Sequence, residues 1–109
     1  MLKKYSTRPV VPSELRRIHS RLATLDLICN GTVLKRTKVC GKPNCRCARD
    51  PDARHGPYYE WSRLENGKLL HSVLPPSKAK EIERAIANHK RLLEVIADWK
   101  SKSAEFILG

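Results

Sequence analysis

The chain has 109 residues, which is enough for one domain with a small core but too few for two independent domains. Hydrophobic residues make up 40% of it and charged residues 30%, a composition typical of globular rather than disordered proteins. No apolar run reaches the roughly 18 residues that a membrane span needs, and the N-terminal segment lacks the apolar core of a secretory leader. We therefore expect a cytoplasmic protein with no membrane partner.

The net charge of +11 is concentrated in the first half of the chain. Residues 1–56 carry 13 basic and 4 acidic side chains, whereas residues 57–109 carry 9 and 7. Charged surfaces that only confer solubility usually mix both signs. An excess of this size therefore favours a polyanionic partner, with nucleic acid first.

The N-terminal part of the chain is predicted to contain a basic arm, residues 1–12, followed by a helix over residues 13–29. Ser13 is a suitable N-cap, and Asn30 with Gly31 is a typical helix stop. Between them, apolar residues recur at the spacing of a helical face, namely Leu15, Ile18, Leu22, Leu25 and Ile28. Residues 32–39 are rich in β-branched side chains and predict a strand leading into a cysteine-rich loop.

Two further strands are predicted after the loop, because Asn66 and Gly67 lie between two apolar runs. Asn-Gly in this setting is the strongest short-range signal for a hairpin. A two-residue turn there places Leu64 opposite Leu69 and Trp61 opposite Ser72. The face of the hairpin that we expect to pack on the core then carries Tyr59, Trp61, Leu70 and Leu74.

The C-terminal segment predicts a long helix that begins near a capping Ser77, after two prolines. A helix from there to Leu108 would be about 48 Å long at about 1.5 Å per residue. Because a domain this small cannot cover such a length, we expect the helix to break near Ser101 or to pack on a partner. A heptad spacing of apolar residues over 82–106, interrupted by His89 and Ser103, is compatible with a homodimer through this helix.

These elements predict an α+β fold of order α-β-β-β-α. It contains a three-stranded antiparallel sheet, a cysteine-rich loop between strands one and two, and a long C-terminal helix. A single domain would span residues 13–100 with the loop at residues 40–55, and residues 101–109 would be a tail or an extension of the helix.

The cysteine-rich loop carries candidate metal ligands. In its C-x4-C-x-C-x7-H pattern, three thiolates and an imidazole match the tetrahedral ligand set that zinc prefers, and the residues are Cys40, Cys45, Cys47 and His55. Basic neighbours would lower the thiol pKa values. We therefore predict a Zn²⁺ site. Cys29 is the alternative to His55 as fourth ligand, and packed thiols or a disulfide are the alternative to metal binding.

Catalysis is not predicted for this loop. Four protein ligands leave no open position for water, and the His-x-Glu of zinc deaminases is absent from the sequence. Two chemical alternatives remain, a nucleophilic pair of Cys47 with His55 and redox chemistry at Cys45 and Cys47.

Basic residues before and within the loop are candidate contacts to nucleic acid. Residues 31–49 contain no acidic side chain, and Tyr58 is a candidate for stacking on a base. Phosphate contacts from such a set would make affinity fall by about 0.9 log units per contact for each tenfold rise in salt. The predicted contact residues are Arg16, Arg17, Arg21, Lys35, Arg36, Lys38, Lys42, Arg46, Arg49 and Tyr58.

The segments "CGKPNCRC" and "HGPYYEW", with the Gly-Lys of the hairpin, resemble a family of small uncharacterised prokaryotic proteins with a CGKxxCxC and HGPYY signature. Members of that family are often encoded near transposases, so the resemblance implies a DNA-related role and favours DNA over RNA. The sequence thus predicts a small, zinc-stapled, DNA-binding module. The alternatives are a protein-interaction adaptor of a recombinase or transposase, docking through residues 92–108, and a thiol redox protein.

Overall fold

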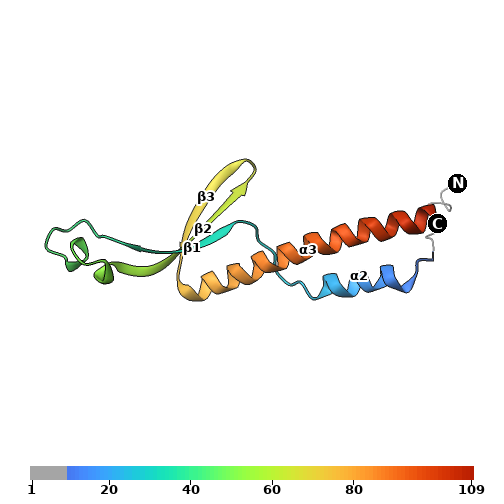
Figure 1. Ribbon diagram of the computed structural model, residues 1–109, viewed down its shortest axis with the longest axis horizontal. Coiled ribbons are helices and arrows are strands. Elements are labelled where there is room, and N and C mark those ends of the chain that lie inside the picture. Colours follow the sequence, from blue (N-terminus) through green and yellow to red (C-terminus); the bar gives the residue numbers. More distant parts are fainter. Residues whose placement is uncertain (1–9) are drawn as a thin grey trace. The chain divides into compact units, whose positions relative to one another are not determined.

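The computed structural model describes residues 10–109, and Figure 1 shows the order of its elements. They are α2 (Ser13–Ala23), β1 (Thr32–Lys38), the short 3-10 helices η1 (Arg46–Ala48) and η2 (Pro51–Ala53), β2 (His55–Glu65), β3 (Lys68–Leu74) and α3 (Pro76–Leu108). This order, the antiparallel sheet and the cysteine loop between β1 and β2 confirm the predicted fold. Residues 1–9 of the predicted basic arm lie outside the described residues.

The chain forms two compact units. One consists of residues 10–26 and 90–109, and the other of residues 27–89, so that α3 contributes to both. The single domain predicted for residues 13–100 includes parts of both units. Within residues 10–109, no helix has the length and apolarity needed to cross a membrane.

The three strands pair in the order β1-β2-β3. Asn66 and Gly67 have φ values of 52° and 80°, as a two-residue hairpin turn of this type requires. Leu64 pairs with Leu69 and Trp61 with Ser72, which confirms the predicted register. The turn chemistry therefore sets the alignment of the whole hairpin.

The two faces of the sheet differ in burial. The face predicted to be the core side is half-buried at Tyr59, Trp61, Leu70 and Leu74. The Trp61 indole donates its N–H to the carbonyl of Asn30 at 2.9 Å, and the Arg63 guanidinium lies 4.0 Å from the indole ring centre. The opposite face is more open, and its aliphatic side chains are 60%, 61% and 67% exposed at Leu64, Leu69 and Val73.

Helix α2 is shorter than predicted. It ends at Ala23 rather than continuing to Cys29, because the backbone N–H and the hydroxyl of Thr24 both bond the carbonyl of Arg21. Further along, the N–H of Cys29 donates to the carbonyl of Ala85 in α3 at 3.1 Å. Tertiary hydrogen bonds thus replace the helical ones that the apolar spacing predicted. The predicted cap is also one residue off, since Pro12 occupies the N-cap position and Ser13 begins the helix.

Helix α3 runs without interruption to Leu108, so the predicted break near Ser101 is wrong and residues 101–108 are an extension of the helix. Lys102 donates to the Asp98 carboxylate one turn earlier at 2.9 Å, and this pair spans the expected break. The helix begins at Pro76 instead of after a Ser77 cap, because the first helical position needs no N–H partner. The homodimer through this helix stays a prediction.

The unit formed by α2 and the second part of α3 has a small core of Leu15, Ile18 and Val95. Trp99 packs beside it, with the ring of His19 edge-on at 5.6 Å. At its margin, Asp98 accepts hydrogen bonds from both Lys102 and Arg21. The bond from Lys102, and then that from Arg21, hold the pKa of the Asp98 carboxyl below its ordinary value.

Gly31 lies directly before β1, at a point where no side chain fits. Its φ is 106°, and a Cβ there would collide with the carbonyl oxygen of Ser62 and approach the Trp61 indole nitrogen. We expect Gly31→Ala to destabilise the chain by roughly 2–3 kcal/mol, since it adds a clash to the cost of an unfavourable backbone conformation. Urea unfolding measures the effect.

The matched control is Gly67→Ala. Gly67 also has a positive φ, of 80°, but no atom lies within 4 Å of its added Cβ. It should therefore lose only about 1 kcal/mol. Equal losses in the two variants would contradict the close approach of Gly31 to β2.

Candidate metal centre

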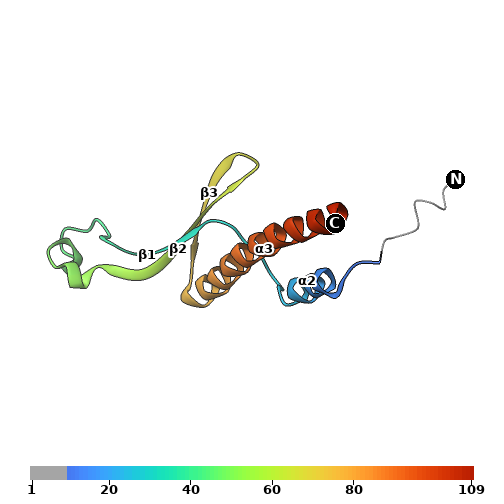
Figure 2. The same ribbon diagram turned by 45° about the vertical axis from the view of Figure 1, so that its right-hand side comes forward.

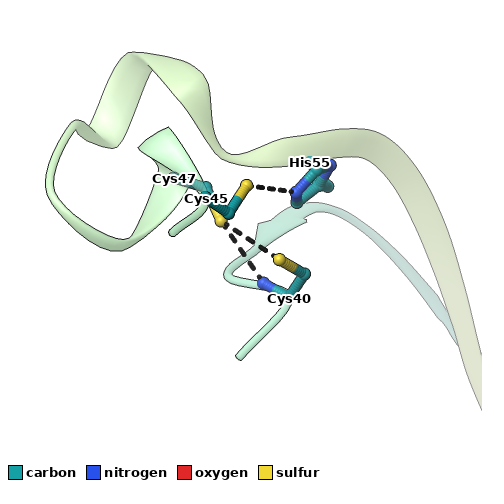
Figure 3. Close-up of side chains that lie close together, drawn as sticks. All are labelled: Cys40, Cys45, Cys47 and His55. Atoms are coloured by element: carbon teal, nitrogen blue, oxygen red, sulfur yellow. Dashed lines mark hydrogen bonds between the residues drawn. The ribbon is translucent and has the colours of Figure 1, made fainter. Parts of the chain in front are cut away.

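The loop between β1 and β2 brings four potential metal ligands together. Cys40 follows the end of β1, Cys45 and Cys47 lie at and within η1, and His55 is the first residue of β2. Figure 3 shows the three sulfurs and the imidazole turned toward one another. We call residues 39–54 the metal loop.

The ligand atoms are close enough together to surround one ion. All four lie within 4.8 Å of one another. The Cys40 and Cys47 sulfurs are 3.6 Å apart, and the Cys45 sulfur is 3.3 Å from His55 Nε2. In a tetrahedron with Zn–S bonds of about 2.3 Å, neighbouring sulfurs are about 3.8 Å apart. These four residues could therefore hold a metal ion with little rearrangement.

The two thiols on η1 have opposite pKa shifts. A hydrogen bond from the backbone of Cys47, and then bonds with the Cys47 and Cys40 thiols, lower the pKa of Cys45. For Cys47, the backbone N–H of Cys40 lowers the pKa, but burial and the two neighbouring sulfurs together raise it above its usual value. A lowered pKa favours the thiolate form of Cys45, and a bound cation would offset the negative charge that raises the pKa of Cys47.

Local hydrogen bonds hold the metal loop in shape. The N–H of Cys45 donates to the carbonyl of Lys42 at 3.1 Å, which closes a turn centred on proline and asparagine. The Asp50 carboxylate accepts from the Arg46 guanidinium at 3.0 Å and from the N–H of Asp52 at 2.9 Å. Cys47 is only 2% exposed, so it acts as the core of this small loop.

A β-bulge aims His55 at the cysteines. Arg36 pairs with Tyr58 but Lys38 pairs with His55, so β2 has one residue more than β1 in this interval. Gly56 lies there with a φ of 123°, a conformation that other residues rarely adopt. Sequence reasoning missed this role, although a glycine and a proline directly after a ligand histidine were the available signal.

Cys29 does not belong to the cluster. It is half-buried, its N–H is bonded to Ala85, and its sulfur is not among the four grouped ligand atoms. Of the two fourth ligands considered, His55 is the one that lies with Cys40, Cys45 and Cys47. The four cysteines of the chain are free thiols.

A family model for a domain of unknown function, DUF6788, matches residues 11–84, which is more than half of the chain. The chain belongs to the DUF6788 family. The match covers α2, the three strands, the metal loop and the first part of α3, in agreement with the predicted membership of an uncharacterised family. No curated protein and no solved structure significantly matches the DUF6788 chain. The link of this protein to transposases and its prokaryotic origin stay predictions.

The predicted nucleic-acid contacts of the DUF6788 chain fall in both units. Seven lie on the strands or the metal loop, namely Lys35, Arg36, Lys38, Lys42, Arg46, Arg49 and Tyr58. The other three, Arg16, Arg17 and Arg21, lie on α2 in the other unit. The seven therefore belong to one unit and the three to the other.

Several of these basic side chains already have partners. Arg36 pairs with Glu60 at 3.2 Å, Arg46 with Asp50 at 3.0 Å, and Arg21 with Asp98 at 2.8 Å. The ammonium of Lys38 lies 5.9 Å from the centre of the Tyr58 ring. The basic residues without an acidic partner are therefore the more available contacts in the DUF6788 chain.

Proposed function

We propose that this protein binds nucleic acid, DNA in preference to RNA, through a zinc-stabilised metal loop and the two strands that carry it. The observation that carries the proposal is the combination of a compact Cys3His group with unpaired positive charge around it. Within residues 10–109, no acidic partner is found for four exposed basic side chains of β1 and the metal loop, Lys35, Lys42, Arg49 and Arg54. Their charge is available to phosphates.

Zinc is the metal that suits the group best. Three thiolates and one imidazole are borderline-soft ligands, and a set of four protein ligands is typical of structural zinc. The ion would fix a 16-residue segment that has little core of its own, which is the role of zinc in small domains. The preference for DNA rests on the resemblance to proteins encoded near transposases.

A shallow hollow beside the metal centre supports the same use. It has a volume of about 420 Å³ and is lined by Lys38, His55, Gly56, Tyr58, Glu60 and Val73. Lys38 supplies a cation and Tyr58 an aromatic ring to its lining, with the ammonium 5.9 Å from the ring centre. Such a pair suits a phosphate next to a base.

The test is salt-dependent binding to a 20-base-pair DNA duplex and to an RNA duplex of the same sequence, measured by fluorescence anisotropy. If Lys35, Lys42, Arg49 and Arg54 each contact a phosphate, log affinity should fall by about 3–4 units per tenfold rise in salt. Changing these four residues to Gln should lower the affinity by about 100-fold or more at moderate salt.

The matched control changes Lys80, Lys90, Arg91 and Lys100 of α3 to Gln, which removes the same net charge from a helix outside the metal loop. It should retain most of the affinity. Equal losses in the two variants would mean that net charge alone, and not this surface, attracts nucleic acid. Tighter binding to RNA would contradict the preference for DNA.

A second candidate function, a protein-interaction adaptor, is favoured by one observation in the α2–α3 unit. A mostly apolar hollow of about 370 Å³ is lined there by residues of both helices, including Leu15, Trp99 and Phe106. Ile107, which also lines the hollow, is 78% exposed, and the neighbouring Leu108 is 87% exposed. An adaptor would bind its protein partner but would show no affinity for nucleic acid at moderate salt, which the same titration detects.

A further inference from the structure

The strands β1 and β2 continue beyond the third strand. Leu74, the last residue of β3, pairs with Tyr59, so β3 covers only the later part of β2. The pairing of β1 with β2 extends further, as far as Lys38 opposite His55. Residues 36–38 and 55–58 thus form a ribbon of two strands only, with the metal loop at its end. Figure 2 shows this ribbon and loop leading away from the β2–β3 turn.

Most side chains of this ribbon and loop are open to solvent. Residues 34–44 and 54–57 are all exposed. The one deeply buried side chain in the metal loop is Cys47, which faces the other metal ligands. The loop therefore has an internal support at the metal centre and presents its outer surface to a partner on several sides.

The shape and charge of this projection suit one groove of duplex DNA. Paired strands are about 4.8 Å apart, and with side chains such a ribbon fits the major groove, which is about 12 Å wide, but not the minor groove, which is about 6 Å wide. Lys42, Arg49 and Arg54 lie in the loop, and Lys35 lies on β1 near the ribbon. Of the two acidic residues of the loop, Asp50 pairs with Arg46 and Asp52 is exposed, so basic side chains still outnumber acidic ones there. The metal loop and the adjoining part of β1 therefore both carry positive charge, which can contact the phosphates on both walls of a groove.

We infer that the metal loop, carried by the two-stranded β1–β2 ribbon, enters the major groove of double-stranded DNA. This inference rests on the proposed nucleic-acid binding and adds the form of the ligand and the groove. Lys42 and Asn44 flank Pro43 in the exposed turn at the loop end, where they face the base edges. Arg49, Arg54 and Lys35 lie further back and contact phosphates.

Methylation by dimethyl sulfate tests the groove, because the reagent modifies guanine N7 in the major groove and adenine N3 in the minor groove. The zinc-loaded full chain is mixed with a mixed-sequence 20-base-pair duplex, and a mobility shift in the same samples reports binding. We expect guanine N7 reactivity to fall by about fivefold in the bound duplex and adenine N3 reactivity to stay unchanged.

Two single substitutions test whether the metal loop is the part of the protein that enters the major groove. Lys42→Gln should weaken the guanine N7 protection and reduce the salt slope by about 1. Lys68→Gln, at the start of β3 beside the β2–β3 turn, removes the same charge and should change neither quantity. Zinc content confirms that both variants keep the metal loop intact.

The possible failures are distinguishable. If the chain binds no nucleic acid, the proposed function and this inference both fail. If the duplex is bound but adenine N3 is protected, or neither groove is protected, the inference alone is overturned. Tighter binding to single strands than to the duplex, or equal effects of Lys42→Gln and Lys68→Gln, would overturn it in the same way.

Discussion

Purified wild-type protein should contain one zinc ion per chain, and Cys47→Ser should abolish this binding. Cys47 is 2% exposed and its sulfur accepts from the backbone N–H of Cys40, so both the metal and the fold of the loop depend on it. Structural zinc sites contribute about 10–16 kcal/mol in small domains, and loss of a ligand should cost more than the roughly 10–100-fold in affinity that follows loss of an outer partner. Elemental mass spectrometry after dialysis measures the zinc content.

Two further variants define the fourth ligand. His55→Ala should lose the metal and His55→Cys should retain it, because a thiolate can replace an imidazole in a structural zinc site. Cys29→Ser is the matched control and should keep one zinc per chain, since its sulfur lies outside the group of four. Loss of zinc in Cys29→Ser, or its retention in Cys47→Ser, would contradict this ligand set. A different metal in the wild-type protein would change the identity of the ion but not its ligands.

Removal of the metal should lower the affinity for duplex DNA by at least about tenfold, which corresponds to about 1.4 kcal/mol. Lys42, Arg49 and Arg54 belong to the metal loop. Without the ion the loop would become ordered only on binding DNA, and the lost conformational entropy would reduce the binding free energy. Anisotropy titrations before and after treatment with a chelator measure the change, and added zinc should restore the affinity.

The control for chelation is Cys47→Ser, which should already bind DNA weakly and should lose nothing more when the chelator is added. Circular dichroism should show that most helix remains in the metal-free protein, since the core of Leu15, Ile18 and Val95 has no part in the site. Unchanged DNA affinity after full removal of zinc would show that the basic side chains bind without a structured loop.

Much of the sheet could be predicted because its signals are local. Asn66 and Gly67 adopt the positive φ values that their turn needs, and the alternation of side chains then sets the pairing of Leu64 with Leu69. The grouping of Cys40, Cys45, Cys47 and His55 could be predicted for a related reason, since three of the four lie within a few residues of one another. Short sequence separation leaves the chain few other ways to arrange them.

Several failures involve contacts between distant segments. The apolar spacing that predicted a helix as far as Cys29 carried no information about the carbonyl of Ala85, which holds the N–H of Cys29 away from a helical partner. The sequence predicted His55 as the fourth ligand and left Cys29 as the alternative, because only the fold decides which of the two lies beside the other cysteines. The bulge at Gly56 was missed as well, because it is a property of two paired strands rather than of one.

From the sequence by itself come the order of the elements, the hairpin register, the excess of positive charge and the four residues of the candidate metal centre. Only the tertiary structure decided where α2 ends, that α3 continues past Ser101, and that β1 and β2 extend beyond β3 as a ribbon with the metal loop at its end. The physical reason is that turns and closely spaced ligands are encoded by neighbouring residues, whereas the end of a helix or strand also depends on which hydrogen-bond partners the folded chain offers, as Ala85 does for Cys29.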